Sequence, residues 1–579
     1  MILQALARYY DDLLQQGKIS APGWTKVKIS YALDIGLDGQ LKQVIPTRQD
    51  ETVGKKTVQR PQEMVLPAPV KKASNISSNF LWENSGYLLG VKQKEDSKRS
   101  RKCFDNAREL HHRLLDSVDS SIAKAILAFF DRWQPENAAE HPALIGQLEE
   151  VTAGANLVFW VDGTYPQEDM LIRETWEHAQ NQEDRDATRM QCLITGREDE
   201  IAKIHPSIKG VRDAQSSGAA LVSFNAPAFC SYGHEQNYNA PVGKHAAFAY
   251  TAALNHLLSD RNSVQHIGDT TVVCWAEGAE EAYQNLAQFA LFGQEMPGLT
   301  DNDLRAALKR LANGLPCDDL GVDPKRPFYV LGLAPNAARL SVRFFLHDSF
   351  GKLMKNVNDH YDRMEIVQPD LDKQEILPLW LMLRETVNLN SRDKAPSPAM
   401  AGATVRAVFS GGPYPASLLE AVMLRIRAES SVTRGRAAII KAYYLKNPHS
   451  DCPKEVLTVS LNEASNNPAY VLGRLFSIYE NVQQAANRGI KATIKDKYFN
   501  SAAAMPASIF PVLNNLYQKH LRKLSPGLRK YFDNQVVELK SKLGESYPVR
   551  MTLAQQGAFD LGYYHQRNSK SNGEDQNND

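Results

Sequence analysis

The chain has 579 residues, a hydrophobic fraction of 43% and a formal net charge of +1 at pH 7. We expect two or three domains, because a domain usually has about 100–200 residues. No apolar run approaches the roughly 20 residues that a membrane span needs. The sequence therefore predicts a cytoplasmic protein without membrane contact.

Charge is unevenly distributed along the chain. Residues 423–568 carry 21 Lys and Arg against 10 Asp and Glu, whereas residues 1–422 carry 45 against 53. Within this first part, residues 42–102 are an exception, with 13 bases and 6 acids. Two basic regions are typical of a protein that contacts a polyanion at two places. For any single one of these Lys and Arg residues, a solvated surface is the favoured interpretation.

The six cysteines are far apart and form no C-x-x-C pair, which argues against a structural zinc site or a disulfide framework. Cys192 and His205 resemble half of a metal site, but two ligands do not make a zinc site. We expect a buried thiol and a hydrogen-bonded histidine there. No cofactor or metal is predicted.

The hydrophobic pattern of the N-terminal part predicts mixed α and β structure. The expected elements are a helix over residues 2–15, strands over 27–33 and 41–46 around a turn at Asp38 and Gly39, a helix over 103–133, a strand over 157–161 and a helix over 171–182.

Residues 67–84 are predicted to form an exposed loop, because two prolines and a run of small polar residues argue against a regular element. The loop combines cations that attract phosphate with amides and two rings suited to stacking on bases. These residues are Lys71, Lys72, Ser74, Asn75, Asn79, Phe80 and Trp82.

A second polar and aromatic loop, residues 221–242, follows an expected buried strand over 218–224 and precedes an expected helix over 244–259. It is rich in amides and aromatic rings and has no Lys or Arg between Ser223 and Pro241. Such groups suit the reading of base edges and faces better than acid–base chemistry. The candidate contacts are Asn225, Tyr232, Gln236 and Asn239.

Further along, residues 270–275 read as a buried strand, and residues 327–333 and 339–346 as a hairpin. In the second hairpin strand, alternation places Leu340, Val342, Phe344 and Leu346 on one face. Arg339 and Arg343 fall on the other face. They face either a phosphate backbone or water, since charge at a sheet edge also protects against aggregation.

Helical patterns dominate after residue 415. The expected helices cover residues 416–429, 434–446, 468–487, 495–504, 508–524 and 528–543. Prolines at helix starts and short connections predict an antiparallel bundle. Its apolar stripe comprises Ile509, Val512, Leu513, Leu516, Leu521 and Leu524, whereas a basic flank suited to a nucleic-acid strand comprises Lys491, Lys495, Lys497, Arg522 and Lys523, with Lys519, Arg529 and Lys530 nearby.

Motifs for catalysis are missing. The sequence has no Walker A, G-x-S-x-G, H-E-x-x-H or kinase signature. Acidic runs at residues 183–186 and 198–200 leave a metal-dependent nuclease as the alternative function, although interleaved arginines favour a solvated surface. We therefore predict a protein that is not an enzyme.

Many segments of the chain resemble, in order, the large subunit of the type I-C CRISPR Cascade complex. They are residues 1–6, 69–72, 79–90, 205–210, 218–225, 267–273, 331–336, 494–499 and 562–567. The series covers nearly the whole chain and is far more specific than any lone motif.

This resemblance implies a non-catalytic subunit of an RNA-guided antiviral surveillance complex. Such a subunit contacts the 5′ end of the guide RNA, recognises the PAM duplex of the target DNA, holds the displaced strand and recruits the helicase-nuclease. The implied protein partners are the Cascade backbone, guide-processing and small subunits. The C-terminal bundle resembles the small subunit, and Met423 is a candidate internal start for a separate product.

The expected fold class is α+β. We expect a mixed α/β body over residues 1–346 with the guide and PAM contacts, a connector over 347–414, a basic helical bundle over 415–568 and a disordered tail over 569–579.

Overall fold

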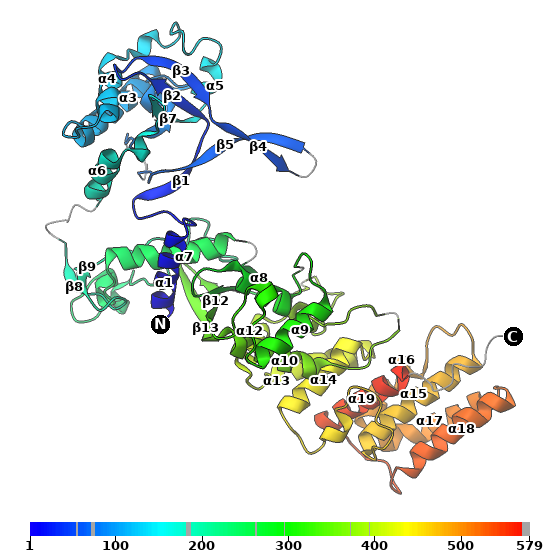
Figure 1. The fold of residues 1–579 in the computed structure, drawn as a ribbon. Coiled ribbons are helices and arrows are strands. Elements are labelled where there is room, and N and C mark those ends of the chain that lie inside the picture. Colours follow the sequence, from blue (N-terminus) through cyan, green and yellow to red (C-terminus); the bar gives the residue numbers. More distant parts are fainter. Residues whose placement is uncertain are drawn as a thin grey trace. The chain divides into compact units, whose positions relative to one another are not determined.

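The computed structural model describes residues 1–53, 56–70, 76–180, 187–260, 263–294, 296–370, 372–392 and 394–569. The chain forms two compact units (Figure 1). Unit 1 contains residues 1–9, 204–229 and 250–579, and unit 2 contains residues 10–203 and 230–249. Helices and several small sheets occur together, so the predicted α+β class is confirmed.

Unit 2 is built around a four-stranded sheet in the order β3-β2-β7-β6. The strands are β2 (Tyr31–Ile35), β3 (Leu41–Pro46), β6 (Trp82–Asn84) and β7 (Asn156–Val161), of which β2 and β7 are parallel. The helices of this unit are α2 (Ser85–Leu88), α3 (Ser97–Leu115), α4 (Ser121–Arg132), α5 (Leu148–Thr152) and α6 (Met170–Gln180). The helical pattern predicted over 103–133 corresponds to two helices, α3 and α4, because Ser120 caps a new helix by accepting from the Ile122 and Ala123 amides.

A second sheet of unit 2 has the order β1-β5-β4, formed by β1 (Trp24–Ile29), β4 (Arg48–Val53) and β5 (Lys56–Pro67). In Figure 1, β4 and β5 form a ribbon that extends beyond the four-stranded sheet. The strand predicted over 27–33 is divided between β1 and β2 at Ser30. A short hairpin of β8 (Arg189–Gln191) and β9 (Glu198–Glu200) completes the strands described for this unit.

Unit 1 contains an antiparallel sheet in the order β10-β11-β12-β13. Its strands are β10 (Val264–Ile267), β11 (Thr270–Ala276), β12 (Pro327–Asn336) and β13 (Arg339–Ser349), so the predicted hairpin is confirmed. Every residue of β11 is buried, as expected. The strand predicted over 218–224 is wrong, because that segment forms only single bridges, from Ala219 to Ile208 and from Ala220 to Arg339.

A bulge in β13 changes the predicted alternation of its side chains. The register between β12 and β13 shifts after Gly332, which pairs with Phe344, so that Leu333 pairs with Val342. Leu340 and Phe344 are buried as expected, but Val342 is 42% exposed. The extra residue in the bulged strand interrupts the regular alternation between Val342 and Phe344.

The rest of unit 1 is helical. The bounds are α8 (Glu281–Phe292), α9 (Asp301–Ala312), α10 (Phe350–Met364), α11 (Leu379–Arg384), α12 (Pro398–Ser410), α13 (Ala416–Glu429), α14 (Arg434–Lys446), α15 (Pro468–Ala486), α16 (Ile494–Ala504), α17 (Pro506–Leu521), α18 (Pro526–Ser541) and α19 (Leu553–Asn568). The six helices predicted after residue 415 are confirmed to within three residues at each end. The prediction missed α19. Helices α1 (Ile2–Gln15) and α7 (Lys244–Ser259) have the predicted bounds.

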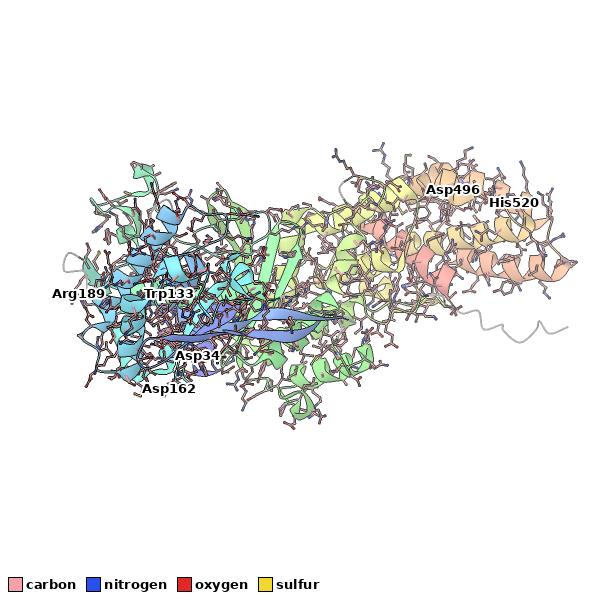
Figure 2. All side chains as sticks on the ribbon, turned by 90° about the horizontal axis from the view of Figure 1, so that it is seen from above. Asp34, Trp133, Asp162, Arg189, Asp496 and His520 are labelled. Carbon is pink, nitrogen blue, oxygen red and sulfur yellow. The ribbon has the colours of Figure 1, made fainter. Side chains whose placement is uncertain are left out.

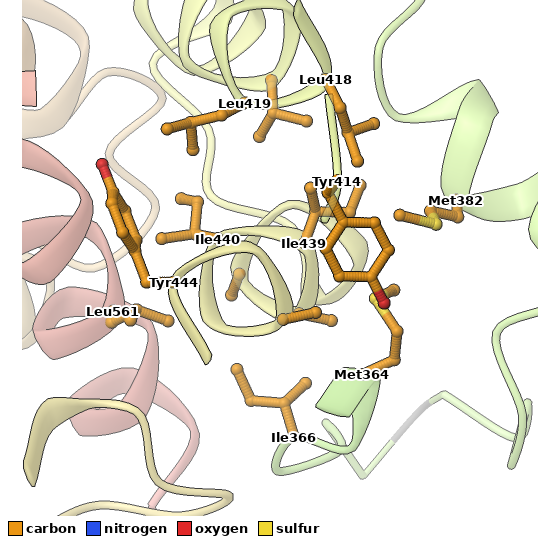
Figure 3. Close-up of a cluster of buried hydrophobic side chains, with 14 of the residues drawn as sticks. Met364, Ile366, Met382, Tyr414, Leu418, Leu419, Ile439, Ile440, Tyr444 and Leu561 are labelled. Carbon is orange, nitrogen blue, oxygen red and sulfur yellow. The ribbon is translucent and has the colours of Figure 1, made fainter. Parts of the chain in front are cut away.

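Helix α14 lies at the centre of the apolar core of unit 1. Figure 3 shows Ile439 and Ile440 surrounded by side chains of α10, α11, α13 and α19, among them Met364, Met382 and Leu561. The same core includes residues of β11, β12 and β13. Residues 347–414 therefore contribute helices to a continuous core, which differs from the connector expected from the sequence. Beyond Ser569, the expected tail lies outside the described residues.

Helices α15 and α19 pack with their backbones in close contact. A Cβ atom on Gly473 would overlap the carbonyl oxygen of Phe559, and one on Gly562 would overlap that of Tyr470. Because only glycine fits at both crossing points, these two residues bring the last helix of the chain against the middle of the bundle. The predicted stripe is mostly core: Leu513, Leu521 and Leu524 are buried, whereas Val512 is 41% exposed.

Candidate nucleic-acid interface

The loop predicted over 67–84 is closed at its base by Asn79 in unit 2. The Asn79 side chain is 3% exposed, and its Oδ1 accepts from the Val70 amide at 3.0 Å. This amide is therefore engaged inside the fold, where it ties residue 70 to residue 79. Lys71, Lys72, Ser74 and Asn75 lie outside the described residues, so their predicted contacts remain predictions.

The two aromatic rings of this loop are anchors and not a stacking surface. Phe80 is 1% exposed and stacks on Trp176 with 5.3 Å between ring centroids. Trp82 is 6% exposed and donates from Nε1 to the Pro67 carbonyl at 2.8 Å. The expectation that these rings stack on bases is corrected, because their apolar surface fills the core of unit 2.

His111 of α3 holds the C-terminal side of the same loop. The Leu81 amide donates to His111 Nε2 at 3.0 Å, and His111 Nδ1 lies 2.7 Å from the Ala107 carbonyl oxygen. Both contacts are satisfied when the imidazole is neutral and carries its proton on Nδ1. Burial lowers the pKa of His111 to about 4, although the bond to Ala107 opposes the shift. Sequence reasoning missed this role, because the Leu81 amide lies thirty residues away along the chain.

The loop over 221–242 divides between the two units after Phe229. Its first part lies in unit 1, where Asn225 is exposed. Phe229 is 40% exposed, and the guanidinium carbon of Arg339 lies 4.4 Å from the centroid of its ring. The backbone at Ala220 bridges to the start of β13. This part of the loop is thus held along the edge strand β13.

The second part of the loop lies in unit 2 and is folded around Asn239. Asn239 Oδ1 accepts from the Ser231 amide at 2.8 Å, and Nδ2 donates to the carbonyls of His234 and Gln236 at 3.1 and 2.9 Å. Tyr232 is 99% exposed, and Gln236 is half-buried. The structure thus brings Tyr232, Gln236 and Asn239 together in one turn, but it commits the Asn239 amide to that turn.

The five predicted cations of the bundle gather at one end of it. Residues 487–530 contain nine Lys and Arg against one acid, Asp496. Lys523 Nζ donates to Asn487 Oδ1 at 3.1 Å, and Asn487 Nδ2 lies 3.2 Å from His520 Nδ1, so the ends of α15 and α17 meet. Figure 2 shows Asp496 and His520 at this same end. We call it the basic end, comprising Arg488, Lys491, Lys495, Lys497, Lys519, Arg522, Lys523, Arg529 and Lys530.

The basic end has few compensating charges. Asp496 Oδ2 accepts from the Thr493 amide at 2.6 Å as part of the capping box of α16, so this carboxylate stabilises a helix start. Lys491, Lys497, Arg522 and Lys523 are exposed, and Lys495 is half-buried. Like charges at one end of a bundle repel each other and attract a polyanion. Arg488 was missed by the sequence reasoning, although its place directly after the cap of α15 pointed to this end.

Two arginines of the first basic region, Arg99 and Arg101, form ion pairs on the surface of α3. Arg99 Nε lies 3.2 Å from Glu95, and Arg101 pairs with Asp105 at 3.7 Å and with Glu136. Of the hairpin arginines, Arg339 covers Phe229, and Arg343 pairs with Asp269 at 2.8 Å. These residues take part in local contacts, so their charge is less available than that of the basic end.

The described residues do not support a nuclease centre. No group of three or more His, Cys, Asp or Glu side chains among them is arranged to hold a metal ion. Residues 183–186 lie outside the described part of the chain, and in the other acidic run Glu200 pairs with Lys244. Cys192 is buried and accepts from the Gly243 amide, and His205 contacts the Tyr250 hydroxyl at 2.7 Å, as expected of a buried thiol and a bonded histidine.

None of the described helices combines the length and the apolar composition needed to cross a membrane. A comparison with curated proteins gives no match.

Residues 6–570 match the model of a family of CRISPR-associated proteins. The chain belongs to that family, Cas_Csd1. Because the match covers nearly the whole chain, it supports the expected large subunit of a Cascade-type complex.

Proposed function

We propose that this chain is the large subunit of a type I-C Cascade complex. In this role it contacts the 5′ end of the guide RNA, recognises the PAM duplex, stabilises the displaced DNA strand and recruits the helicase-nuclease. Its protein partners are the backbone, guide-processing and small subunits of the complex, and it acts in the cytoplasm without catalysing a reaction.

The basic end of the bundle is the observation that carries this proposal. Nine cations against one committed carboxylate provide a field that favours a phosphate backbone. Most of these side chains are exposed, so a strand that lies along the surface can reach them. Backbone contacts of this kind position a nucleic acid without reading its sequence.

The loop over 221–242 is the candidate PAM reader. Asn225 and Tyr232 are exposed and Gln236 is half-buried, so an amide or a ring from each part of the loop is open to a ligand. In RNA-guided recognition the protein reads only the short PAM, and base pairing reads the rest. Lys71, Lys72, Ser74 and Asn75 remain a second candidate.

Salt-dependent binding tests the proposal. We expect the purified full-length chain to bind a labelled DNA duplex with an affinity that falls steeply between low and physiological salt, because each phosphate contact releases counterions. Fluorescence anisotropy measures this slope. A chain that only contacts proteins would show weak binding without a salt dependence, and that result would overturn the proposal.

The non-catalytic role has a separate test. Incubation of the chain with Mg²⁺ or Mn²⁺ and labelled DNA or RNA should leave both intact. Metal-dependent cleavage that copurifies with the chain would contradict this part of the proposal.

An internal start at Met423 is a further part of the proposal. Met423 is 2% exposed and lies within α13, so the shorter product would begin inside that helix and keep α14 to α19. Immunoblotting with an antibody to the C-terminus should detect the product. The absence of a band beginning at this residue would remove this part.

A further inference from the structure

Unit 1 has a cavity of about 300 Å³ beside β10 and α11 that no predicted contact uses. Its apolar wall includes Phe292 and Trp380, and the indole of Trp380 is 48% exposed. Its polar lining consists of Gln265, His266, Arg384 and Lys394. An exposed tryptophan in a concave site is a stacking surface for a flat ring, and the cavity has the volume of a small-ligand site.

A second cavity, of about 460 Å³, has Asp269 in its lining, the residue that follows Gly268 of the first cavity. It is lined by Arg343, Arg406, Thr270 and Ser397. A Cβ atom on Gly268 would lie 3.0 Å from the Cα of Pro398, so the turn packs closely against the start of α12. Gly268 and Pro396 line the first cavity, and Asp269 and Ser397 line the second. Because residues 268 and 269 are consecutive, as are residues 396 and 397, the two cavities are adjacent to each other.

The charges of the two cavities are strongly biased. Their lining contains four Lys and Arg side chains, Arg343, Lys394, Arg384 and Arg406, together with His266. Among the described lining residues Asp269 is the one acid, and Arg343 pairs with it at 2.8 Å. Arg406 of α12 is exposed and lines the second cavity. Ala399, Gly402 and Ala403 of the same helix also line this cavity, and their small size leaves it open.

We propose that the two cavities form one site for an unpaired nucleotide of a nucleic-acid strand, with the base against Trp380 and the phosphate near Arg343 and Arg406. A flat ring next to a cationic, hydroxyl-lined hollow matches a base joined to a phosphate. Arg343 already pairs with Asp269, but an apolar side chain of a partner protein would make no use of the positive charges of Arg384, Lys394 and Arg406. This inference rests on the proposed function, because it supplies the nucleic acid.

Photo-cross-linking tests the site directly. The full-length chain is irradiated with single-stranded RNA or single-stranded DNA that carries 5-iodouracil, and the cross-linked peptides are identified by mass spectrometry. We expect a cross-link in the peptide that contains Trp380. The strand that gives it identifies the source of the nucleotide, guide RNA or DNA.

Variants test the energetics of the same site. Trp380→Ala should weaken oligonucleotide binding about tenfold and abolish the cross-link, whereas Trp380→Phe, which keeps an aromatic face, should bind within about threefold of the wild type. Arg343→Gln/Arg406→Gln, which removes the two cations placed near the phosphate, should weaken binding by a similar factor. Lys309→Gln/Lys325→Gln removes the same charge from exposed positions of unit 1 and should have little effect.

The outcomes separate this inference from the proposed function. Wild-type binding with cross-links elsewhere, and Trp380→Ala unchanged, would overturn the nucleotide site and leave the proposed function intact. A loss of complex assembly by Trp380→Ala with normal oligonucleotide binding would assign the cavity to a protein side chain and overturn the inference. If the wild-type chain binds neither strand, the proposed function fails and the inference fails with it.

Discussion

The guanidinium carbon of Arg339 lies 4.4 Å from the centroid of the Phe229 ring, where the loop over 221–242 meets β13. Arg339 is the first residue of β13, and its backbone bridges to Ala220. One residue of the edge strand therefore holds the loop at two points, by its backbone and by its side chain. The side chain covers the ring of Phe229, four residues after the exposed Asn225.

We predict that Arg339 and Phe229 are energetically coupled. In a double-mutant cycle of Arg339→Ala and Phe229→Ala, the coupling free energy should be about 0.5–1 kcal/mol, the usual value for an exposed cation–π pair. Urea unfolding of the full-length chain and its variants measures it. Additive effects of the two substitutions would mean that the contact contributes nothing to stability.

Asn239 and Gln236 should behave differently although they lie in the same turn. Asn239→Ala removes three hydrogen bonds, each worth about 0.5–1.5 kcal/mol, and should speed amide hydrogen exchange over residues 231–239. Gln236→Ala should leave exchange unchanged and alter the PAM preference of the assembled complex by about 1–3 kcal/mol at one base. Equal exchange in the two variants would contradict this division of roles.

The basic end should contribute affinity without sequence preference. Replacing Lys495, Lys497, Arg522 and Lys523 by Ala should weaken DNA binding and reduce the salt slope, by about 0.7–0.9 for each phosphate that the variant no longer neutralises. Anisotropy titrations at several salt concentrations measure both quantities.

A matched control removes four exposed cations elsewhere in unit 1, Lys309, Lys325, Lys352 and Lys373. This variant should bind nearly as the wild type does. An equal loss of affinity in both variants would show that net charge alone is responsible, and a change in sequence preference would contradict the assigned role.

Acid should destabilise unit 2 through His111. The pKa of His111 is about 4 in the fold against an ordinary value of 6.5, because burial disfavours the charged ring. The unfolded chain therefore binds the proton more readily between these values. The contribution of neutral His111 to the free energy of unfolding is complete above about pH 6.5. It is lost as the pH falls toward 4, by at most about 3 kcal/mol.

Urea unfolding followed by tryptophan fluorescence at a series of pH values tests this prediction. His111→Gln should lose less stability than the wild type over the same pH range, and His234→Gln, at an exposed position, should follow the wild type. Parallel curves for the wild type and His111→Gln would contradict the role of His111.

Much of the fold could be predicted because its helices have strong local signals. Helices α1, α7, α13 and α14 have the predicted bounds, since apolar periodicity and flanking prolines or polar caps mark their ends. The helical pattern predicted over 103–133 did not place the break between α3 and α4 at Ser120. The capping hydroxyl and its hydrogen bonds decide the break, and they appear only in three dimensions.

The candidate site could be predicted by residue type but not by exposure. Asn79 and Asn239 were chosen because amides suit base edges, yet the fold uses both amides to close loops. Phe80 was chosen because its ring could stack on a base, yet the ring stacks on Trp176, which is almost a hundred residues away in the sequence. Contacts between distant segments decide such cases, and local composition carries no information about them. The basic end was predictable because its charges are close together in the sequence.

The most direct test of the central claim is a selection of target duplexes by the assembled complex. A duplex with a guide-matched target next to randomised bases is bound, recovered and sequenced, with the complete complex and with a complex that lacks this chain. We predict that the complete complex enriches a short motif beside the target and that the enrichment disappears without this chain. The same motif in both selections would contradict the claim, because another subunit would then read the PAM.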